Sequence, residues 1–318
     1  DEYYKIDVTV GNISTDTTLG YDWQDELHKE DLSDNHIQKI IRAILKQAIL
    51  EGIHEVTFQG EDEGLGVNFK KHGELSNKGI IPTVLVSSFV AKLKTLSELD
   101  PSVSEVPQLG KLCFKVDNII VIASVSTFPT IMGERIFLKI YKPPIALEKI
   151  ISSKTELSEV KQALVKPGII LVCGSSLSGK THVIYSLLLE AAKNKSKNIM
   201  TLESISKYEL AGVNQCEFNE NVGFNMDKAA RFIEFQSPDI IYLEGIKSKE
   251  SFDYFSSLVY NDKTVIMEFL ANNMEDLRNK MAFSDFDTLK TIISCMIFIH
   301  SQNSVEVFNK ETLQKYLG

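Results

Sequence analysis

The sequence predicts an α/β protein: a small α+β domain hinged to a second domain whose sheet is mainly parallel. Three observations support this prediction. In the second half, short apolar runs alternate with helical patterns, which is typical of a parallel sheet. In the first half, the apolar stretches are shorter and alternate with polar residues. Between the two halves, Lys142-Pro-Pro144 stops an apolar stretch and makes a natural hinge.

In chain order, residues 1–32 are polar and contain the only tryptophan, Trp23. We expect them to be a linker or the end of a preceding module. The α+β domain is expected at residues 33–142, beginning with a helix that Ser33 caps and that runs to about Leu50. A second helix is expected at 83–96, and strands at 55–59, 65–69, 111–117, 119–125 and 134–141.

The second domain is expected at residues 143–318. Its predicted strands are 168–173, 198–202, 239–243 and 264–269. Residues 286–299 are apolar, and their pattern leaves a helix and a pair of strands both open.

A complete phosphate-binding motif follows the first of these strands. Residues 174–181 have the form G-x-x-x-x-G-K-[ST], and an apolar pattern at helical spacing follows them. This strand-loop-helix context predicts that backbone N–H groups wrap the phosphates of ATP at a helix N-terminus. Lys180 is expected to reach the outer phosphates, and the Thr181 hydroxyl to bind Mg²⁺. The alternative is a Gly/Ser turn that happens to contain a lysine. The expected nucleotide-binding residues are Gly174, Ser175, Ser176, Leu177, Ser178, Gly179, Lys180, Thr181 and His182.

Composition excludes several other classes of protein. The net charge of −9 over 318 residues argues against non-specific nucleic-acid binding. The four cysteines form no C-x-x-C pair, and the histidines have no metal-ligand spacing, so no metal other than Mg²⁺ is expected. No apolar run is long enough to span a membrane. The first residues are unlike a signal peptide. We therefore expect a cytoplasmic protein.

Taken in order, the motifs resemble the motor ATPases of type IV pili and type II secretion over about residues 35–300. The stretches that carry the resemblance are 48–55, 67–73, Ser126-Thr-Phe-Pro-Thr130 with Gly133-Glu134, the phosphate loop, Thr201-Leu-Glu203, Val213-Asn-Gln215 with Gly223, and Pro238-Asp-Ile-Ile-Tyr-Leu243. The resemblance implies a PAS-like N-terminal domain and a RecA-like motor domain. It also implies assembly into a ring, such as a hexamer, on the inner-membrane platform of a pilus or secretion machine.

The sequence departs from the family's catalytic motifs. The acidic box T-I-E-D-P-x-E keeps Glu203, but Ser204 and Lys207 replace its other acids. The segment G-E-x-R-D begins Glu244-Gly245 here, so a glycine takes the place of the catalytic glutamate. Further departures are Leu270 for the histidine of the T-L-H-T-N box, Asn68, Lys70 and Ser124 for arginines, and Leu177 for the middle glycine of the phosphate loop.

Two acidic residues remain as candidate catalytic groups. Glu203 is expected to line the Mg²⁺ site as in the family, or else to be only a polar strand end. Glu244 is expected to hold Mg²⁺ through water, or else to be a solvated carboxylate. Loss of a general base and of arginines slows phosphoryl transfer strongly.

We therefore predict ATP binding with weak or absent hydrolysis. The expected role is a structural or regulatory subunit, in a ring of its own copies or mixed with an active paralogue. The alternatives are a fully active hexameric motor that powers pilus assembly, retraction or secretion, and an unrelated P-loop enzyme such as a kinase.

Overall fold

The structure is a computed structural model that describes residues 23–27, 34–71, 73–116, 119–141, 143–176, 178–219, 222–245, 249–281, 291–301 and 304–317. The predictions for Ser33, His72, Lys142 and Leu177, and for most of residues 1–32, lie outside these ranges. The described residues divide into two compact units, one up to residue 141 and the other from residue 143. Each unit has its own sheet.

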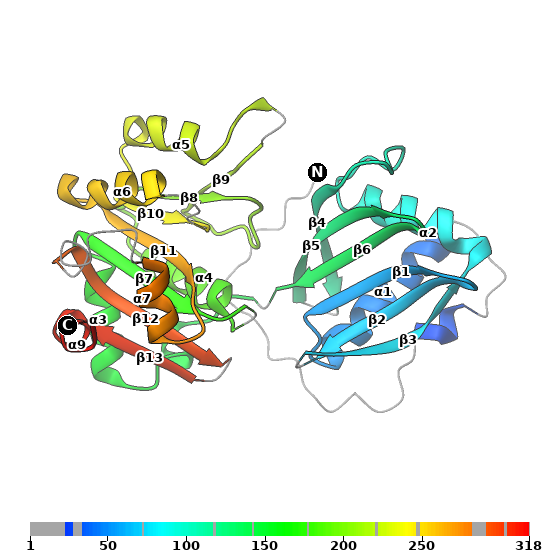
Figure 1. The fold of residues 1–318 in the computed structure, drawn as a ribbon, viewed down its shortest axis with the longest axis horizontal. Coiled ribbons are helices and arrows are strands. Elements are labelled where there is room, and N and C mark those ends of the chain that lie inside the picture. Colours follow the sequence, from blue (N-terminus) through cyan, green and yellow to red (C-terminus); the bar gives the residue numbers. More distant parts are fainter. Residues whose placement is uncertain are drawn as a thin grey trace. The chain divides into compact units, whose positions relative to one another are not determined.

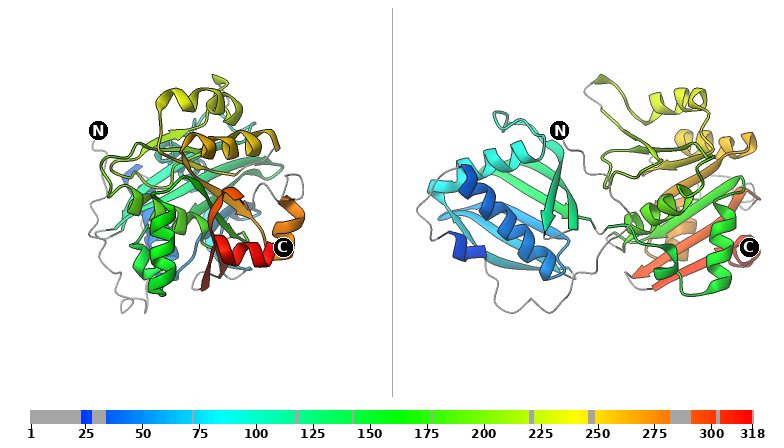
Figure 2. Two further views of the ribbon diagram at one scale, coloured as in Figure 1. Left: turned by 90° about the vertical axis from the view of Figure 1, so that its left-hand side faces the viewer. Right: turned by 180° about the vertical axis from the view of Figure 1, so that it is seen from behind.

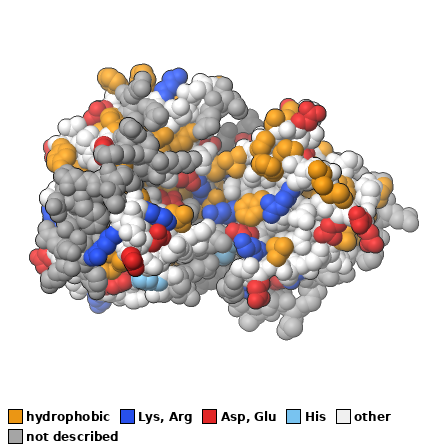
Figure 3. Space-filling model, in the orientation of Figure 1, with side chains coloured by type: hydrophobic (Ala, Val, Ile, Leu, Met, Phe, Trp, Pro, Cys, Tyr) orange, Lys and Arg blue, Asp and Glu red, His pale blue; other side chains and the backbone are white. Residues whose placement is uncertain are grey.

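The N-terminal unit is a six-stranded antiparallel sheet in the order β3-β2-β1-β6-β5-β4, with two helices on one face (Figures 1 and 2). Its elements are η2 (Trp23–Glu26), α1 (Asp34–Leu50), β1 (Glu55–Glu61), β2 (Gly64–Lys71), β3 (Glu74–Pro82), α2 (Thr83–Leu96), β4 (Gln108–Val116), β5 (Ile119–Thr130) and β6 (Gly133–Ile140). The isoleucine stripe of α1 packs onto the sheet, as the helical periodicity predicts. The other face of the sheet carries hydrophobic, basic and acidic side chains (Figure 3).

Two features of this unit differ from the prediction. Trp23, expected in a linker, is fully buried in the core of the sheet and helices. Burying the large indole ring supplies apolar contact that a polar linker does not offer, so the core of this unit begins before residue 33. Strand β3 was not predicted, because it is an edge strand whose first four residues are exposed and carry no apolar alternation.

The C-terminal unit has a seven-stranded sheet in the order β13-β12-β7-β11-β10-β8-β9, in which only β13 is antiparallel to its neighbour. Its strands are β7 (Gly168–Gly174), β8 (Ile199–Glu203), β9 (Asn214–Glu217), β10 (Ile240–Leu243), β11 (Thr264–Leu270), β12 (Ile293–Ser301) and β13 (Ser304–Asn309). Its helices are η3 (Leu147–Lys149), α3 (Lys154–Ala163), α4 (Lys180–Ala191), α5 (Met226–Ile233), η5 (Glu234–Gln236), α6 (Lys249–Ser257), η6 (Leu258–Asn261), α7 (Met274–Met281) and α9 (Lys310–Leu317).

Helices cover both faces of this sheet (Figures 1 and 2). Alternate residues of the central strands pack into a core with α5, α6, α7 and α9, while α3 and α4 lie on the opposite face. Burial on both faces explains why these strands read as continuous apolar runs. The segment 286–299, left open by its pattern, forms β12 from Ile293, where pairing with β7 fixes it as a strand. Its residues 286–290 lie outside the described ranges.

None of the helices in the described part of the chain is long and apolar enough to cross a bilayer.

Candidate functional site

The phosphate-binding motif lies between the end of β7 and the start of α4. Gly179 immediately precedes α4 with φ 102°, a left-handed conformation that a residue with a side chain adopts only under strain. A Cβ atom on Gly174 would lie 2.5 Å from Ser178 Oγ and 2.8 Å from the carbonyl oxygen of Ile299. The backbone therefore requires glycine at both positions, where the chain leaves the strand and where it enters the helix.

Lys180 begins α4 and turns back over the loop. Its Nζ atom donates to the carbonyl oxygens of Gly174 at 3.1 Å and Ser175 at 2.7 Å, and it lies 3.8 Å from Glu268 Oε1. Within the described ranges, Ser178 Oγ is buried and has no hydrogen-bond partner. A buried hydroxyl without a partner is a group that a bound phosphate oxygen would satisfy.

The remaining predicted phosphate-binding residues follow the chain around this turn. Thr181 and His182 occupy the first turn of α4, whose N-terminus favours anions. Ser175 and Ser176 follow β7 directly, and Leu177 lies outside the described residues. Eight of the nine predicted phosphate-binding residues, Lys180 among them, thus lie at the strand-helix junction.

Four neighbouring strands carry a glutamate at the same level of their carboxyl ends. Glu203 of β8 is paired in register with Glu217 of β9. Glu244 follows the last paired residue of β10, which places it between Glu203 and Glu268 of β11. In parallel strands, residues in register point to the same face of the sheet. For Glu203, Glu244 and Glu268 that face is the one covered by α4.

Lys207, in the loop after β8, lies between two of these carboxylates. Its Nζ donates to Glu244 Oε1 at 2.5 Å and is 3.8 Å from Glu203 Oε2. The second oxygen of Glu244 accepts hydrogen bonds from the backbone N–H and the hydroxyl of Ser204, both at 2.6 Å. Tyr185 of α4 donates to Glu203 Oε2 at 2.6 Å and accepts the Lys207 N–H at 2.7 Å. The lysine and both acids are mostly withdrawn from solvent: Lys207 is 3% exposed, Glu203 0% and Glu244 22%.

The pKa values of the two acids are shifted in opposite directions. Burial raises the pKa of Glu203, against the opposing effects of the Lys207 charge and the Tyr185 hydrogen bond. Burial would also raise the pKa of Glu244, but the Lys207 charge and the hydrogen bonds from Lys207 and Ser204 outweigh it, so that pKa is lowered. Glu244 is therefore the ionised partner of Lys207, and Glu203 is the acid closer to protonation.

The Mg²⁺ implied by the resemblance needs oxygen ligands that are free to bind it. Both oxygens of Glu244 are taken by Lys207 and Ser204, and one oxygen of Glu203 is taken by Tyr185. Among the residues that the structure describes, no group of three His, Cys, Asp or Glu is arranged to hold a metal. The strand-end acids as they stand do not fit a divalent ion. The assignment of Thr181 as a ligand of Mg²⁺ stays a prediction.

Sequence reasoning singled out Glu203 and Glu244, and the structure brings these two together. The roles of two other residues were missed. Tyr185 was predicted only as part of the helical pattern that follows the phosphate-binding motif, and Glu268 only as part of the strand 264–269. Lys207 was noted only as a lost acid. The available signal was a lysine four residues after a strand-end glutamate, next to a second strand that also ends in glutamate.

Two of the three positions that replace family arginines, Lys70 and Ser124, bond within the N-terminal unit. Lys70 pairs with Glu55 at 3.1 Å, and Ser124 Oγ lies 3.1 Å from the Tyr141 hydroxyl. Gly245 follows Glu244 with φ 63° and offers no side chain.

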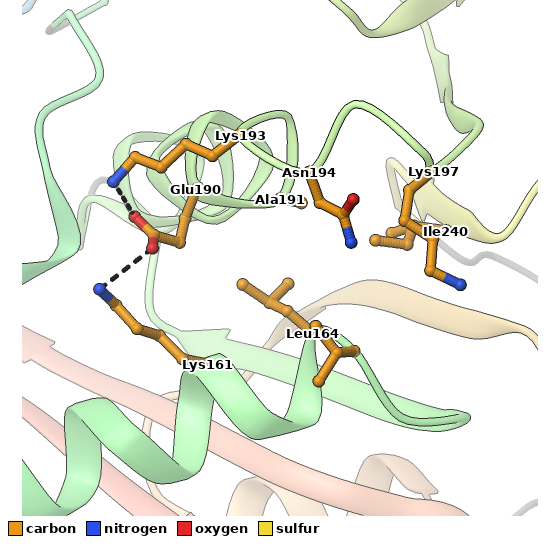
Figure 4. A pocket seen from close by; sticks show the side chains of 9 residues that line it. Lys161, Leu164, Glu190, Ala191, Lys193, Asn194, Lys197 and Ile240 are labelled. Carbon is orange, nitrogen blue, oxygen red and sulfur yellow. Dashed lines mark hydrogen bonds and ion pairs between the residues drawn. The ribbon is translucent and has the colours of Figure 1, made fainter.

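A separate cavity of about 320 Å³ lies at the far end of α4 from the phosphate loop (Figure 4). Its lysines have acidic partners: Lys161 and Lys193 share Glu190 at 3.0 and 2.5 Å, and Lys197 pairs with Asp239 at 3.0 Å. Because these charges are already matched, the cavity gives no reason to place the phosphates there.

Comparison with known proteins agrees with this architecture. The sequence profile of the family described as "Type II/IV secretion system protein" matches residues 30–273. The chain is 29% identical over 232 residues to the type II secretion system protein E of Pseudomonas aeruginosa, covering 72% of this chain and 46% of that protein. It is 30% identical over 236 residues to the protein of the same name from Klebsiella pneumoniae, with the same coverage of 72% and 46%.

A solved structure shares the fold. The pilus retraction motor PilT with bound ADP superposes with a TM-score of 0.64 at 16% identity, covering 86% of this chain and 85% of that one. At this identity the likeness concerns the fold alone. The chain spans about half the length of the curated relatives it matches.

Proposed function

The chain belongs to the type II/IV secretion system protein family, and on that premise we propose that it binds ATP at residues 174–182 and hydrolyses it slowly or not at all. One observation carries the proposal. Gly179 has the left-handed conformation that the turn into α4 requires and Lys180 lies over the loop, while Glu244, the acid that follows β10, has both oxygens bonded within the chain.

Three features support the binding part. Gly179 has the conformation that the turn into α4 requires, Lys180 lies over the loop, and the Ser178 hydroxyl is buried without a partner in the described part of the chain. A helix N-terminus with free N–H donors favours phosphate. The structurally similar motor PilT has been solved with ADP, and we propose that this chain takes the corresponding triphosphate.

The slow hydrolysis follows from three missing groups. A general base accelerates a reaction by a factor of about 10²–10⁴. Gly245 has no side chain to act as a base, and the charge of Glu244 is paired with Lys207. An arginine that stabilises the transferring phosphoryl group contributes about 10³–10⁵. Lys70, at one of those positions, is paired with Glu55, and Ser124, at another, is uncharged. Together these losses leave a site suited to hold ATP rather than to turn it over.

We propose a structural or regulatory role in a type IV pilus or type II secretion machine. The chain would sit in a ring of its own copies or beside an active paralogue, on the cytoplasmic side of the inner-membrane platform. Support comes from the family and from the names of the relatives. A nucleotide held without hydrolysis would fix ring geometry, while an active neighbour does the mechanical work.

The test pairs binding with turnover on the full chain. Titration with a fluorescent ATP analogue should saturate, and Lys180→Ala should lose at least about tenfold in affinity because the phosphates lose a charge-assisted partner. Lys193→Ala serves as the matched control. It removes a lysine that pairs with Glu190 at the other end of α4, and the variant should bind nucleotide as the unaltered chain does. Absence of saturable binding at millimolar nucleotide, or phosphate release at about 1 s⁻¹, a usual enzyme rate, would refute the proposal.

A further inference from the structure

We propose that Lys207 is a built-in cation for the Glu203–Glu244 pair, and that its ammonium group occupies the place beside these carboxylates that a divalent metal ion would otherwise take. The inference rests on the proposed function. A site that binds nucleotide would have the charge of a lysine side chain at the strand ends in place of a metal ion. The acidic box of the family has an acid at the position that Lys207 occupies in this chain, so the lysine is a feature of this sequence.

The contacts of the ammonium group carry the first step. Lys207 Nζ lies 2.5 Å from Glu244 Oε1 and 3.8 Å from Glu203 Oε2, and it also donates to the carbonyl oxygen of Ile205. With 3% of its side chain exposed, the lysine is buried, and a lysine is almost never buried unless it is paired. Its hydrogen bonds therefore go to acids and backbone rather than to water.

The second step is that the rest of the chain fixes the lysine in this position. Its backbone N–H donates to the Tyr185 hydroxyl at 2.7 Å, and the same hydroxyl donates to Glu203 Oε2 at 2.6 Å. Tyr185 is 1% exposed and belongs to α4, the helix that begins at the phosphate loop. Lys207 is thus held from α4 and from β8 together, and a tethered charge competes with a free ion at a high effective concentration.

The third step concerns the neighbouring acids. Glu217 accepts from the backbone N–H of Ser206 at 2.7 Å, and Glu268 accepts from the Tyr242 hydroxyl at 3.2 Å and lies 3.8 Å from Lys180. Each of the four strand-end glutamates is therefore engaged by at least one donor of this chain, and Glu203 Oε1 is buried with no hydrogen-bond partner among the described residues. A divalent ion that entered at Glu203 and Glu244 would have to displace Lys207 and overcome the repulsion of its charge.

Removing the charge while keeping the stem of the side chain tests the inference. Mn²⁺ is titrated into the nucleotide-free full chain, and the free ion is measured by electron paramagnetic resonance. The unaltered chain and the charge-keeping Lys207→Arg should take up no Mn²⁺ at this site up to about 1 mM, a weak-binding limit for carboxylate sites. Lys207→Met should take up one ion per chain with a dissociation constant at least about tenfold lower.

Controls make the outcome specific. Lys161→Met removes another ion-paired lysine of the same unit and should leave Mn²⁺ uptake unchanged. Adding Glu244→Gln to Lys207→Met should abolish the new uptake. If Lys207→Met does not fold, Lys207→Gln, which removes the charge but keeps a polar side chain beside Glu244, should show the same gain. Uptake by the unaltered chain that Glu203→Gln removes would overturn the inference, as would equal uptake before and after loss of the lysine charge.

The titration contains no nucleotide, so it fails or succeeds independently of the proposed function. A chain that binds no ATP but gains Mn²⁺ on loss of Lys207 would refute the proposed function alone. A chain that binds ATP and also takes up Mn²⁺ beside an intact Lys207 would refute the inference alone.

Discussion

Replacing Lys207 by methionine should destabilise the C-terminal unit by about 3 kcal/mol, at the lower end of the range of about 3–5 kcal/mol for breaking a buried ion pair. The pair is buried, with Lys207 3% and Glu203 0% exposed, and Nζ lies 3.8 Å from Glu203 and 2.5 Å from Glu244. A charge pair about 4 Å apart near a protein surface interacts with about 4 kcal/mol. Methionine keeps most of the apolar stem, so the loss reports the charge.

The loss should depend on pH in a defined direction. Without the Lys207 charge, which lowers the pKa of Glu203, that already raised pKa moves further above the unfolded value. A raised folded pKa contributes stability that is full below the unfolded pKa and is lost as the pH rises through the folded pKa. In the unaltered chain, the lowered pKa of Glu244 contributes stability that disappears as the pH falls through its folded pKa. The Glu203 effect makes the deficit of the variant larger at pH 8 than at pH 5, whereas the contribution of the lowered Glu244 pKa is already complete at pH 5 and is the same at both pH values.

Urea unfolding followed by circular dichroism measures the free energy at both pH values. Trp23, the only tryptophan, lies in the N-terminal unit, so its fluorescence follows that unit separately and should not shift. Lys161→Met is the matched control: its side chain is 36% exposed, and surface pairs contribute about 0–1 kcal/mol. A deficit no larger than that of the control, or one that grows toward pH 5, would refute the assigned ion pair.

Three further predictions use other parts of the site. Tyr185→Phe removes the hydroxyl that bonds Glu203 and should lower the free energy of urea unfolding by about 1–3 kcal/mol, because buried polar groups lose their partner. An unchanged free energy of unfolding would mean that this hydroxyl does not hold Glu203 and Lys207 in place. Gly179→Ala forces a side chain onto φ 102°, and it should weaken binding of a fluorescent nucleotide and lower the melting temperature, with a strain of about 1–2 kcal/mol. Burial raises the pKa of the Cys295 thiol to about 12, so a thiol reagent at pH 8 should modify the exposed Cys113 first; equal rates would contradict the fold.

Central features of the fold were predictable because they depend on local signals. The run 168–173 is buried on both faces of a sheet, so it is uniformly apolar, and the glycines and lysine after it specify the turn into α4. Three of the four edge strands escaped prediction for the opposite reason. Strands β3, β9 and β13 are paired on one side only and partly exposed, so tertiary pairing rather than an apolar pattern makes them strands.

The site was only partly predictable from the sequence. The motif marked Lys180, and the strand ends marked Glu203 and Glu244, because both signals are local. The role of Lys207 depends on β8 and β10 being neighbours in register, which is a property of the sheet and not of either segment. A substitution that looks like the loss of an acid in sequence is the gain of an ion-pair partner in space.

The central claim is that this chain holds ATP without cutting it, and a single-turnover measurement tests it most directly. ATP labelled at the γ-phosphate is bound to excess protein, unbound nucleotide is removed, and phosphate release from the bound complex is followed by chemical quench. The account predicts a complex that forms, that Lys180→Ala abolishes, and that releases phosphate more slowly than about 10⁻² s⁻¹, at least a hundredfold below ordinary enzyme rates. Release of the bound phosphate at about 1 s⁻¹ or faster would contradict it.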